Sequence, residues 1–203
     1  MFLKLVIITS LIFAPVIGFA DSSGLYIWEG LLGYSISFTN SPTSVQQRNF
    51  FSSETGLGYI IGGWAYIGGV FNYTPVTEKT ADGNGNTINH TETYQYYGPT
   101  FGYMGDNWFV LGHYFANAEK KDTITGGNGF VTQNVDNTGT GFGINVGYKF
   151  SVGSSFEMAP MIAFKSINYV NCKDPYSGAT STCNPSIQQT EFTPYFTFLF
   201  NFK

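Results

Sequence analysis

The two histidines are the side chains best suited to acid–base chemistry near neutral pH. His90 lies two residues before Glu92, and His113 lies beside Tyr114 in an otherwise apolar run. An acyl-transfer site would need a serine within hydrogen-bonding reach of a histidine that an acid holds in place. No serine lies at a spacing from either histidine that singles out such a site. We therefore predict no catalytic residues, and His113 is better explained as an interior hydrogen-bonding residue.

The two cysteines, Cys172 and Cys183, suggest a second kind of chemistry. Ten residues separate them in a polar stretch near the C-terminus. In an exported protein such a pair closes a short loop and stabilises it by about 2 to 3 kcal/mol. We predict a disulfide, with two free thiols as the alternative.

One segment has the alternating oxygen ligands of a calcium loop. Residues 82–87 read Asp-Gly-Asn-Gly-Asn-Thr. An EF-hand needs glycine at its sixth position and glutamate at its twelfth, and those positions hold Thr87 and Thr93. A glycine- and asparagine-rich turn explains the segment better, so we predict no metal and no cofactor.

The elements that position these residues are strands, and the last one has the clearest pattern. From Phe192 to Phe202 every even position is phenylalanine or Pro194. This alternation predicts a strand with one strongly apolar face. So many rings on one face would crowd the interior of a water-soluble barrel, whereas lipid accommodates them without a complementary cavity.

The first 20 residues have the pattern of a secretory signal peptide. Lys4 precedes an apolar run from Leu5 to Phe13, and Gly18 and Ala20 precede a cut before Asp21. A membrane anchor is the alternative, but the run is shorter than the roughly 20 residues that a spanning helix needs. We therefore expect one domain, residues 21–203, after removal of residues 1–20.

Composition narrows the class. Charged residues make up 11% of the chain, against about 25% in a soluble domain, while aromatic residues reach 18%. The mean hydropathy of −0.02 excludes a bundle of spanning helices, and the net charge of −4 argues against a nucleic-acid partner. Average hydropathy with many aromatics is typical of strands that alternate lipid-facing and lumen-facing residues.

Turn signals divide the mature chain into alternating runs, and we predict an all-β fold: an eight-stranded antiparallel up-and-down transmembrane β-barrel. The connections alternate between short turns and long polar loops at 39–49, 74–92, 116–137 and 170–187, which is the pattern of outer-membrane barrels. The predicted strands are 24–38, 50–61, 64–73, 93–104, 108–115, 138–150, 155–169 and 188–202.

The alternation also assigns faces. Phe142 to Phe150 and Phe156 to Phe164 place aromatic and aliphatic residues on one face, and polar or small residues on the other. In the first strand we assign Tyr26, Trp28 and Tyr34 to lipid and Glu29 to the lumen. The third and fifth strands fit either phase. The predicted lumen charges are Glu29, Lys149, Glu157, Lys165 and Glu191, which we expect to pair and to close the barrel to most solutes.

Tryptophan marks a membrane boundary, because indole rings prefer the interface between hydrocarbon and water. All three tryptophans lie near the beginning of a predicted odd-numbered strand, and such positions lie at one end of an up-and-down barrel. The predicted girdle consists of Trp28, Trp64, Trp108, Tyr148, Phe150, Phe200 and Phe202.

With these features the chain resembles the small eight-stranded outer-membrane barrels of the OmpA, OmpX and opacity-protein kind. The resemblance covers the mature chain as architecture, and Phe196 to Phe202 match the aromatic end of the last strand, although Lys203 follows. It implies a monomer in the bacterial outer membrane, inserted by the barrel assembly machinery and surrounded by outer-membrane lipid, with four surface loops free to contact a ligand.

The resemblance does not determine the activity, because this architecture serves many functions. A structural or adhesin-like surface protein fits the four polar loops best. A narrow porin is the alternative, favoured by the charged lumen, and a lipid acyltransferase or deacylase is less favoured.

Overall fold

The computed structural model describes residues 24–37, 45–81, 87–126, 131–173 and 178–202. The predicted signal peptide, the segment 82–86 and Lys203 lie outside these residues. All elements of the described part are strands, and it contains no helix that is long and apolar enough to span a bilayer. The strands are β1 (Gly24–Ser37), β2 (Val45–Ile61), β3 (Ala65–Ala81), β4 (Thr87–Met104), β5 (Trp108–Thr125), β6 (Val131–Tyr148), β7 (Phe150–Ser151), β8 (Phe156–Lys173) and β9 (Thr180–Phe202).

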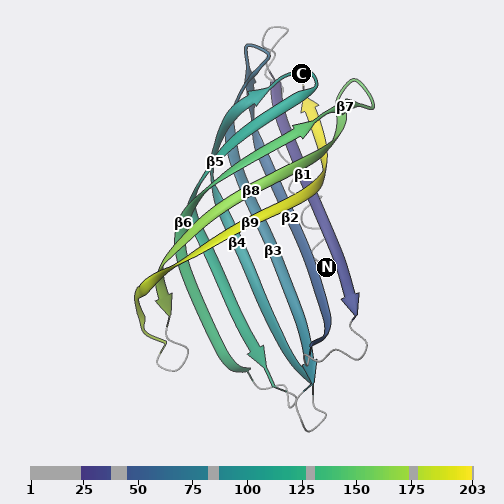
Figure 1. Ribbon diagram of the computed structural model, residues 1–203. Coiled ribbons are helices and arrows are strands. Elements are labelled where there is room, and N and C mark those ends of the chain that lie inside the picture. The colour runs from purple at the N-terminus through teal and green to yellow at the C-terminus, as the bar shows by residue number, and fades with distance from the viewer. Residues whose placement is uncertain (1–23, 38–44, 82–86, 127–130, 174–177, 203) are drawn as a thin grey trace.

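The strands form one antiparallel ring (Figure 1). Their order is β6-β5-β4-β3-β2-β1-β9-β8, and β6 also pairs with β8, which closes the circle. The two-residue β7 continues β6 along the same neighbour, since Phe150 pairs with Met158 after Gly147 has paired with Met161. The interruption lies opposite Pro160, which has no N–H to donate to the ladder. The predicted all-β, eight-stranded, up-and-down barrel is therefore confirmed, with one strand in two segments.

Short turns lie at one end of the barrel, which we call the turn end. Gly62 and Gly63 make the β2–β3 turn with φ of 61° and 78°, backbone conformations that glycine adopts without steric cost. Residues 105–107 and 152–155 make the other two turns. The opposite end, which we call the loop end, contains the four longer connections.

The predicted long loops are wrong over much of their length. The strands of each pair continue toward the loop end, so that β3 reaches Ala81 and β5 reaches Thr125. β-Branched residues and cross-strand charges stabilise these extensions. Arg48 lies opposite Glu78, with Nε 3.2 Å from Oε1, for example.

The interior of the barrel is a packed core. Its fully buried side chains include many aromatic rings: Tyr26, Trp28, Tyr66, Tyr96, Phe109, Phe115 and Tyr169. Glycines on the inner face make room for these rings. A Cβ at Gly56 would lie 2.0 Å from the indole nitrogen of Trp28, its cross-strand partner. The lumen is thus filled by side chains rather than by charges alone.

The predicted faces of the first strand are wrong. Tyr26 and Trp28 point inward, each 1% exposed, and Glu29 points outward. The predicted faces rest on the rule that aromatic residues face lipid. Here the glycines of β2 receive large rings inside, while Leu25, Ile27 and Leu31 form an apolar outer face. The ambiguous strands are now assigned as well: Tyr66 and Val70 of β3 and His113 of β5 point inward.

Candidate functional site

A buried ion pair lies in the middle of the lumen. Lys165 Nζ is 2.6 Å from Glu54 Oε2, and both side chains are at most 1% exposed. Asn145 and Asn72 donate hydrogen bonds to the two oxygens of Glu54, the latter over 3.4 Å. Lys165 also donates to the hydroxyl of Tyr195 over 2.9 Å. We call these five residues the lumen network.

The lumen network extends toward the loop end through hydroxyl groups. The Tyr195 hydroxyl lies 2.7 Å from Ser52 Oγ, which in turn lies 2.7 Å from Thr74 Oγ1. Tyr195 of β9 and Ser52 of β2 come from strands that do not pair with each other, and Asn145 of β6 reaches Glu54 of β2 from the opposite wall, so hydrogen bonds cross the barrel interior. A cross-braced interior of this kind opposes widening of the lumen.

A second ionic cluster closes the turn end. Lys149 Nζ lies 3.2 Å from Glu157 Oε2. Tyr26 donates a hydrogen bond to the same carboxylate of Glu157. The Lys149 nitrogen lies 5.4 Å from the centre of the Tyr26 ring. This cluster joins β1, β8 and the residue between β6 and β7.

The predicted lumen charges therefore lie in four places, three inside the barrel and one, that of Glu29, outside it. The pair of Lys149 and Glu157 points inward at the turn end, and Lys165 points inward in the lumen network. Glu191 also faces the interior, where it accepts hydrogen bonds from Tyr96 and from Gln189 over 2.8 Å. Although Lys165 and Glu191 are register partners, the ion pair of Lys165 is with Glu54.

The prediction that Glu29 faces the lumen is wrong, because this residue lies on the outer surface. Ser53 donates to it over 2.7 Å, and Thr55 donates to its other oxygen. Its neighbour on β9 is Phe198.

Glu54 is the residue that sequence reasoning missed. The second strand has no predicted face, although Ser52, Glu54 and Gly56 alternate with larger residues such as Phe51 and Leu57. That alternation was a signal for an inward-facing carboxylate.

The predicted girdle lies at the turn end, with one exception. Trp64 and Trp108 are 58% and 56% exposed there, and Phe150, Phe200 and Phe202 are exposed as well. Tyr148 stacks edge-on against Trp108, with ring centres 4.8 Å apart. Trp28 does not belong to the girdle, because it is buried in the lumen.

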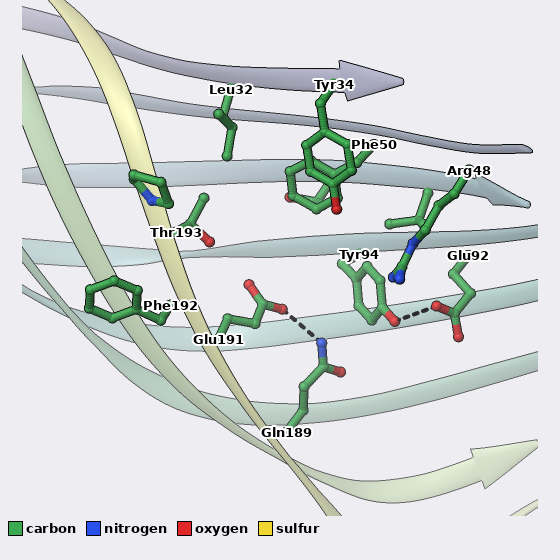
Figure 2. Close-up of a pocket in the computed structure, with 13 residues that line it drawn as sticks. Leu32, Tyr34, Arg48, Phe50, Glu92, Tyr94, Gln189, Glu191, Phe192 and Thr193 are labelled. Carbon is green, nitrogen blue, oxygen red and sulfur yellow. Dashed lines mark hydrogen bonds between the residues drawn. The ribbon is translucent and has the colours of Figure 1, made fainter. Parts of the chain in front are cut away.

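A cavity of about 470 Å³ lies between the lumen network and the loop end, and Figure 2 shows the side chains that line it. Its apolar wall includes Leu32, Val76 and the stacked rings of Tyr34 and Phe50, whose centres are 5.0 Å apart. The polar side chains that line it are Arg48, Thr74, Glu92, Tyr94, Gln189, Glu191 and Thr193.

Most charges at this cavity are already paired. Arg48 contacts Glu78, and Glu92 accepts hydrogen bonds from Lys120 over 2.7 Å and from Tyr94 over 2.8 Å. Glu191 takes its hydrogen bonds from uncharged donors, Tyr96 and Gln189.

The histidines lie in different surroundings. His90 Nε2 is 2.7 Å from Asp122 Oδ1, and with Glu92 these residues bring three possible metal ligands within 4.8 Å. The ammonium of Lys120 lies against Glu92, which is unfavourable for a cation there. His113 is buried, and its Nδ1 lies 2.8 Å from Thr100 Oγ1.

Cys172 and Cys183 form a disulfide between β8 and β9 near the loop end. It lies next to the register pair of Cys172 with Ser181. The predicted bridge is confirmed.

The sequence matches no protein-family model and no curated protein. Among solved structures, Neisserial surface protein A is 11% identical with a TM-score of 0.46, over 90% of this chain and 100% of that one. The outer membrane protease OmpT from Escherichia coli is 10% identical with a TM-score of 0.39, over 89% and 94%.

The attachment invasion locus protein Ail of Yersinia pestis, solved with the heparin analogue sucrose octasulfate, is 9% identical with a TM-score of 0.41, over 88% and 96%. All three identities and scores are too low for an inference about function.

Proposed function

We propose that this chain is an integral, monomeric barrel of the bacterial outer membrane with a largely occluded lumen, and that it acts as a structural or surface-interaction (adhesin-like) protein. The single observation that carries this proposal is the polarity of the barrel, which is inverted relative to that of a soluble protein. The ion pair of Glu54 and Lys165 is buried inside, while large apolar side chains cover the outside.

The outer surface fits a lipid environment. Soluble monomers rarely expose apolar patches larger than a few hundred Å². Here exposed apolar residues occur on strands all around the ring: Leu57, Ile67, Phe101, Val110, Phe142, Ile162 and Phe196. The exposed Trp64 and Trp108 at the turn end suit the interface between hydrocarbon and water.

Strand length supports a loop end that projects from the membrane. A spanning strand needs about 9 to 11 residues, whereas β2 to β6 contain 17 or 18. The additional strand residues contain the charged pairs of the loop end. One example is Lys173, whose Nζ lies 2.8 Å from Asp136 Oδ2. A raised polar rim of this kind is a surface that another molecule can contact.

Tryptophan quenching tests the membrane location. Single-tryptophan variants are refolded into vesicles whose lipid chains contain bromine, which quenches fluorescence on contact. We expect strong quenching of Trp64 and Trp108 and little of Trp28, which is buried in the lumen. Equal and weak quenching of all three tryptophans would contradict a membrane-inserted barrel in which Trp64 and Trp108 face the lipid.

Conductance tests the occluded lumen against the alternative of a narrow porin. A solute path would have to pass the lumen network and the cluster of Lys149 and Glu157. We expect no steady conductance from refolded protein in a planar bilayer, because ions would displace buried, paired charges. Sustained conductance from single insertions would favour the porin.

The surface role is tested in cells. Replacing residues 82–86 and 127–130 by short Asn-Gly turns leaves the described strands intact, and the barrel should still insert. Attachment of cells that display the protein should fall in the variant. Unchanged attachment, at equal surface amounts, would contradict an adhesin-like role of these connections.

A further inference from the structure

The pairing between β1 and β9 stops halfway along the barrel. The ladder runs from Leu25 opposite Phe202 to Leu31 opposite Phe196. Beyond this point residues 32–37 of β1 pair with β2, and residues 180–182 and 187–195 of β9 pair with β8 in the described structure. The two strands also diverge in Figure 1, where β1 and β9 run to different sides of the loop end. We call this unpaired stretch the seam.

Pro194 explains where the seam begins. The N–H of Asn201 donates to Ser155, on the β8 side, over 3.0 Å. Because N–H groups alternate sides along a strand, the even-numbered residues of β9 direct theirs toward β1. Pro194 is the next even residue after Phe196, and it has no N–H. The ladder therefore ends at the position where the donor is missing.

The loop-end cavity lies directly behind the seam. Its lining includes Leu32 and Tyr34 on the β1 side and Thr193 and Pro194 on the β9 side (Figure 2). Its volume, about 470 Å³, is in the range of cavities that hold one small ligand. The seam thus joins this cavity to the outer surface of the barrel.

The outer rim of the seam is apolar where the seam begins, whereas farther toward the loop end Ser35 donates a hydrogen bond to Asn49 over 2.6 Å on the exposed surface. Phe192 is 69% exposed beside it on β9, and Phe51, the partner of Gly33, is exposed on β2. These residues face lipid if the barrel lies in the membrane as proposed above. The seam then opens sideways into the outer half of the bilayer rather than into water.

The chemistry of the site indicates an amphiphile. Leu32, Phe50 and Val76 offer an apolar wall to a hydrocarbon chain. The backbone edge at Gly33 has no ladder partner among the described residues of β9, and in the same described part of the chain Glu191 accepts hydrogen bonds from two uncharged donors, Tyr96 and Gln189. These acceptors suit a head group that donates hydrogen bonds through hydroxyls.

We propose that the seam admits a single-chain lipid with a hydroxylated head group from the outer leaflet into the loop-end cavity, and that Pro194 keeps this lateral entrance open. This inference rests on the membrane location proposed above. Its tests use readouts inside the cavity and across the seam, so that their failure is distinguishable from a failure to insert.

The first experiment tests the seam. Continuing the β1–β9 register would place Ser35 opposite Phe192. We expect the Ser35→Cys/Phe192→Cys variant to resist oxidation to a second disulfide, and the matched pair Ile27→Cys/Phe200→Cys, which is paired in the ladder, to oxidise readily. Adding Pro194→Val restores an N–H and should allow the first pair to oxidise. Ready oxidation with Pro194 present would overturn the open seam.

The second experiment tests the ligand. The three native tryptophans are replaced by phenylalanine, and Phe50→Trp places a reporter in the cavity. In phosphatidylcholine vesicles, monoacylglycerol with a brominated chain should quench it about as strongly as it quenches an outward Trp64, and Pro194→Val should remove this effect. The control Phe109→Trp, buried near the turn end, should stay bright.

Two results would overturn the ligand assignment. One is an unquenched Phe50→Trp reporter in vesicles in which a separate variant that keeps Trp64 as its single tryptophan is quenched, because the barrel then inserts but admits no chain. The other is equal quenching by brominated phosphatidylcholine, which would mean that the cavity does not prefer a single-chain, hydroxylated lipid.

Discussion

Replacing Glu54 by glutamine tests whether the lumen network holds the barrel together. The substitution keeps the size of the side chain and removes its charge, so it creates no cavity. Lys165 then keeps its hydrogen bond to Tyr195 and the ring contact at 5.2 Å, but no carboxylate at 2.6 Å. A buried ammonium group without its counter-ion is the expected defect.

The size of the effect follows from the burial of both partners. Removing one member of a buried ion pair typically costs 3 to 5 kcal/mol. Release of the lysine proton limits the cost, because neutralising a lysine near pH 7 requires about 4 to 5 kcal/mol. We therefore expect Glu54→Gln to lower the free energy of unfolding by about 3 to 5 kcal/mol.

The assay is urea unfolding in detergent micelles, with the folded fraction read from the mobility of unboiled samples on gels and extrapolated linearly to zero urea. Glu29→Gln is the matched control: it makes the same chemical change on the outer face. It should be neutral or stabilising, since a lipid-facing carboxylate costs free energy.

The double variant Glu54→Met/Lys165→Met completes the test. It removes both charges, and such replacements are often neutral or stabilising. It should therefore recover most of the stability that Glu54→Gln loses. A loss below about 1 kcal/mol for Glu54→Gln, the size expected of an exposed pair, would refute a structural role of this ion pair.

Two further predictions concern packing and the disulfide. Gly56→Ala should destabilise the barrel by about 1 to 3 kcal/mol in the same urea assay, because the methyl group overlaps the indole of Trp28; Gly69→Ala, with its nearest neighbour at 3.6 Å, is the control and should change little. Cys172→Ser/Cys183→Ser should cost up to about 3 kcal/mol, and alkylation of the native protein without reductant should add no mass; a gain of two alkyl groups would contradict the bridge.

The fold was largely predictable because three strands have unambiguous alternation. In β6, β8 and β9 one face is aromatic or aliphatic and the other is small or polar, and the structure has these faces as predicted. In β1 both faces contain large apolar residues, so alternation alone could not tell lipid from lumen. Glycines on the neighbouring strand, such as Gly56, determine that the large rings of β1 point inward. Which glycine lies opposite which ring depends on the strand register.

The candidate site was less predictable, because its contacts join residues far apart in the chain. Glu54 and Lys165 are partners across the lumen, while Glu191, the sequence-based partner of Lys165, lies beside it along the sheet. Which of two nearby carboxylates takes an ammonium depends on barrel diameter and side-chain packing. Neither quantity can be read from spacing.

The lumen network also constrains what the loop-end cavity can do. Thr74 lines this cavity and contacts Ser52, whose hydroxyl contacts Tyr195, and Tyr195 accepts from Lys165. The floor of the cavity is therefore part of the buried network, and an open path toward the turn end would require breaking it. A lipid that enters through the seam has to leave through the seam or the loop end. If the proposed entry of a lipid is correct, its passage through the barrel to the turn end is not expected.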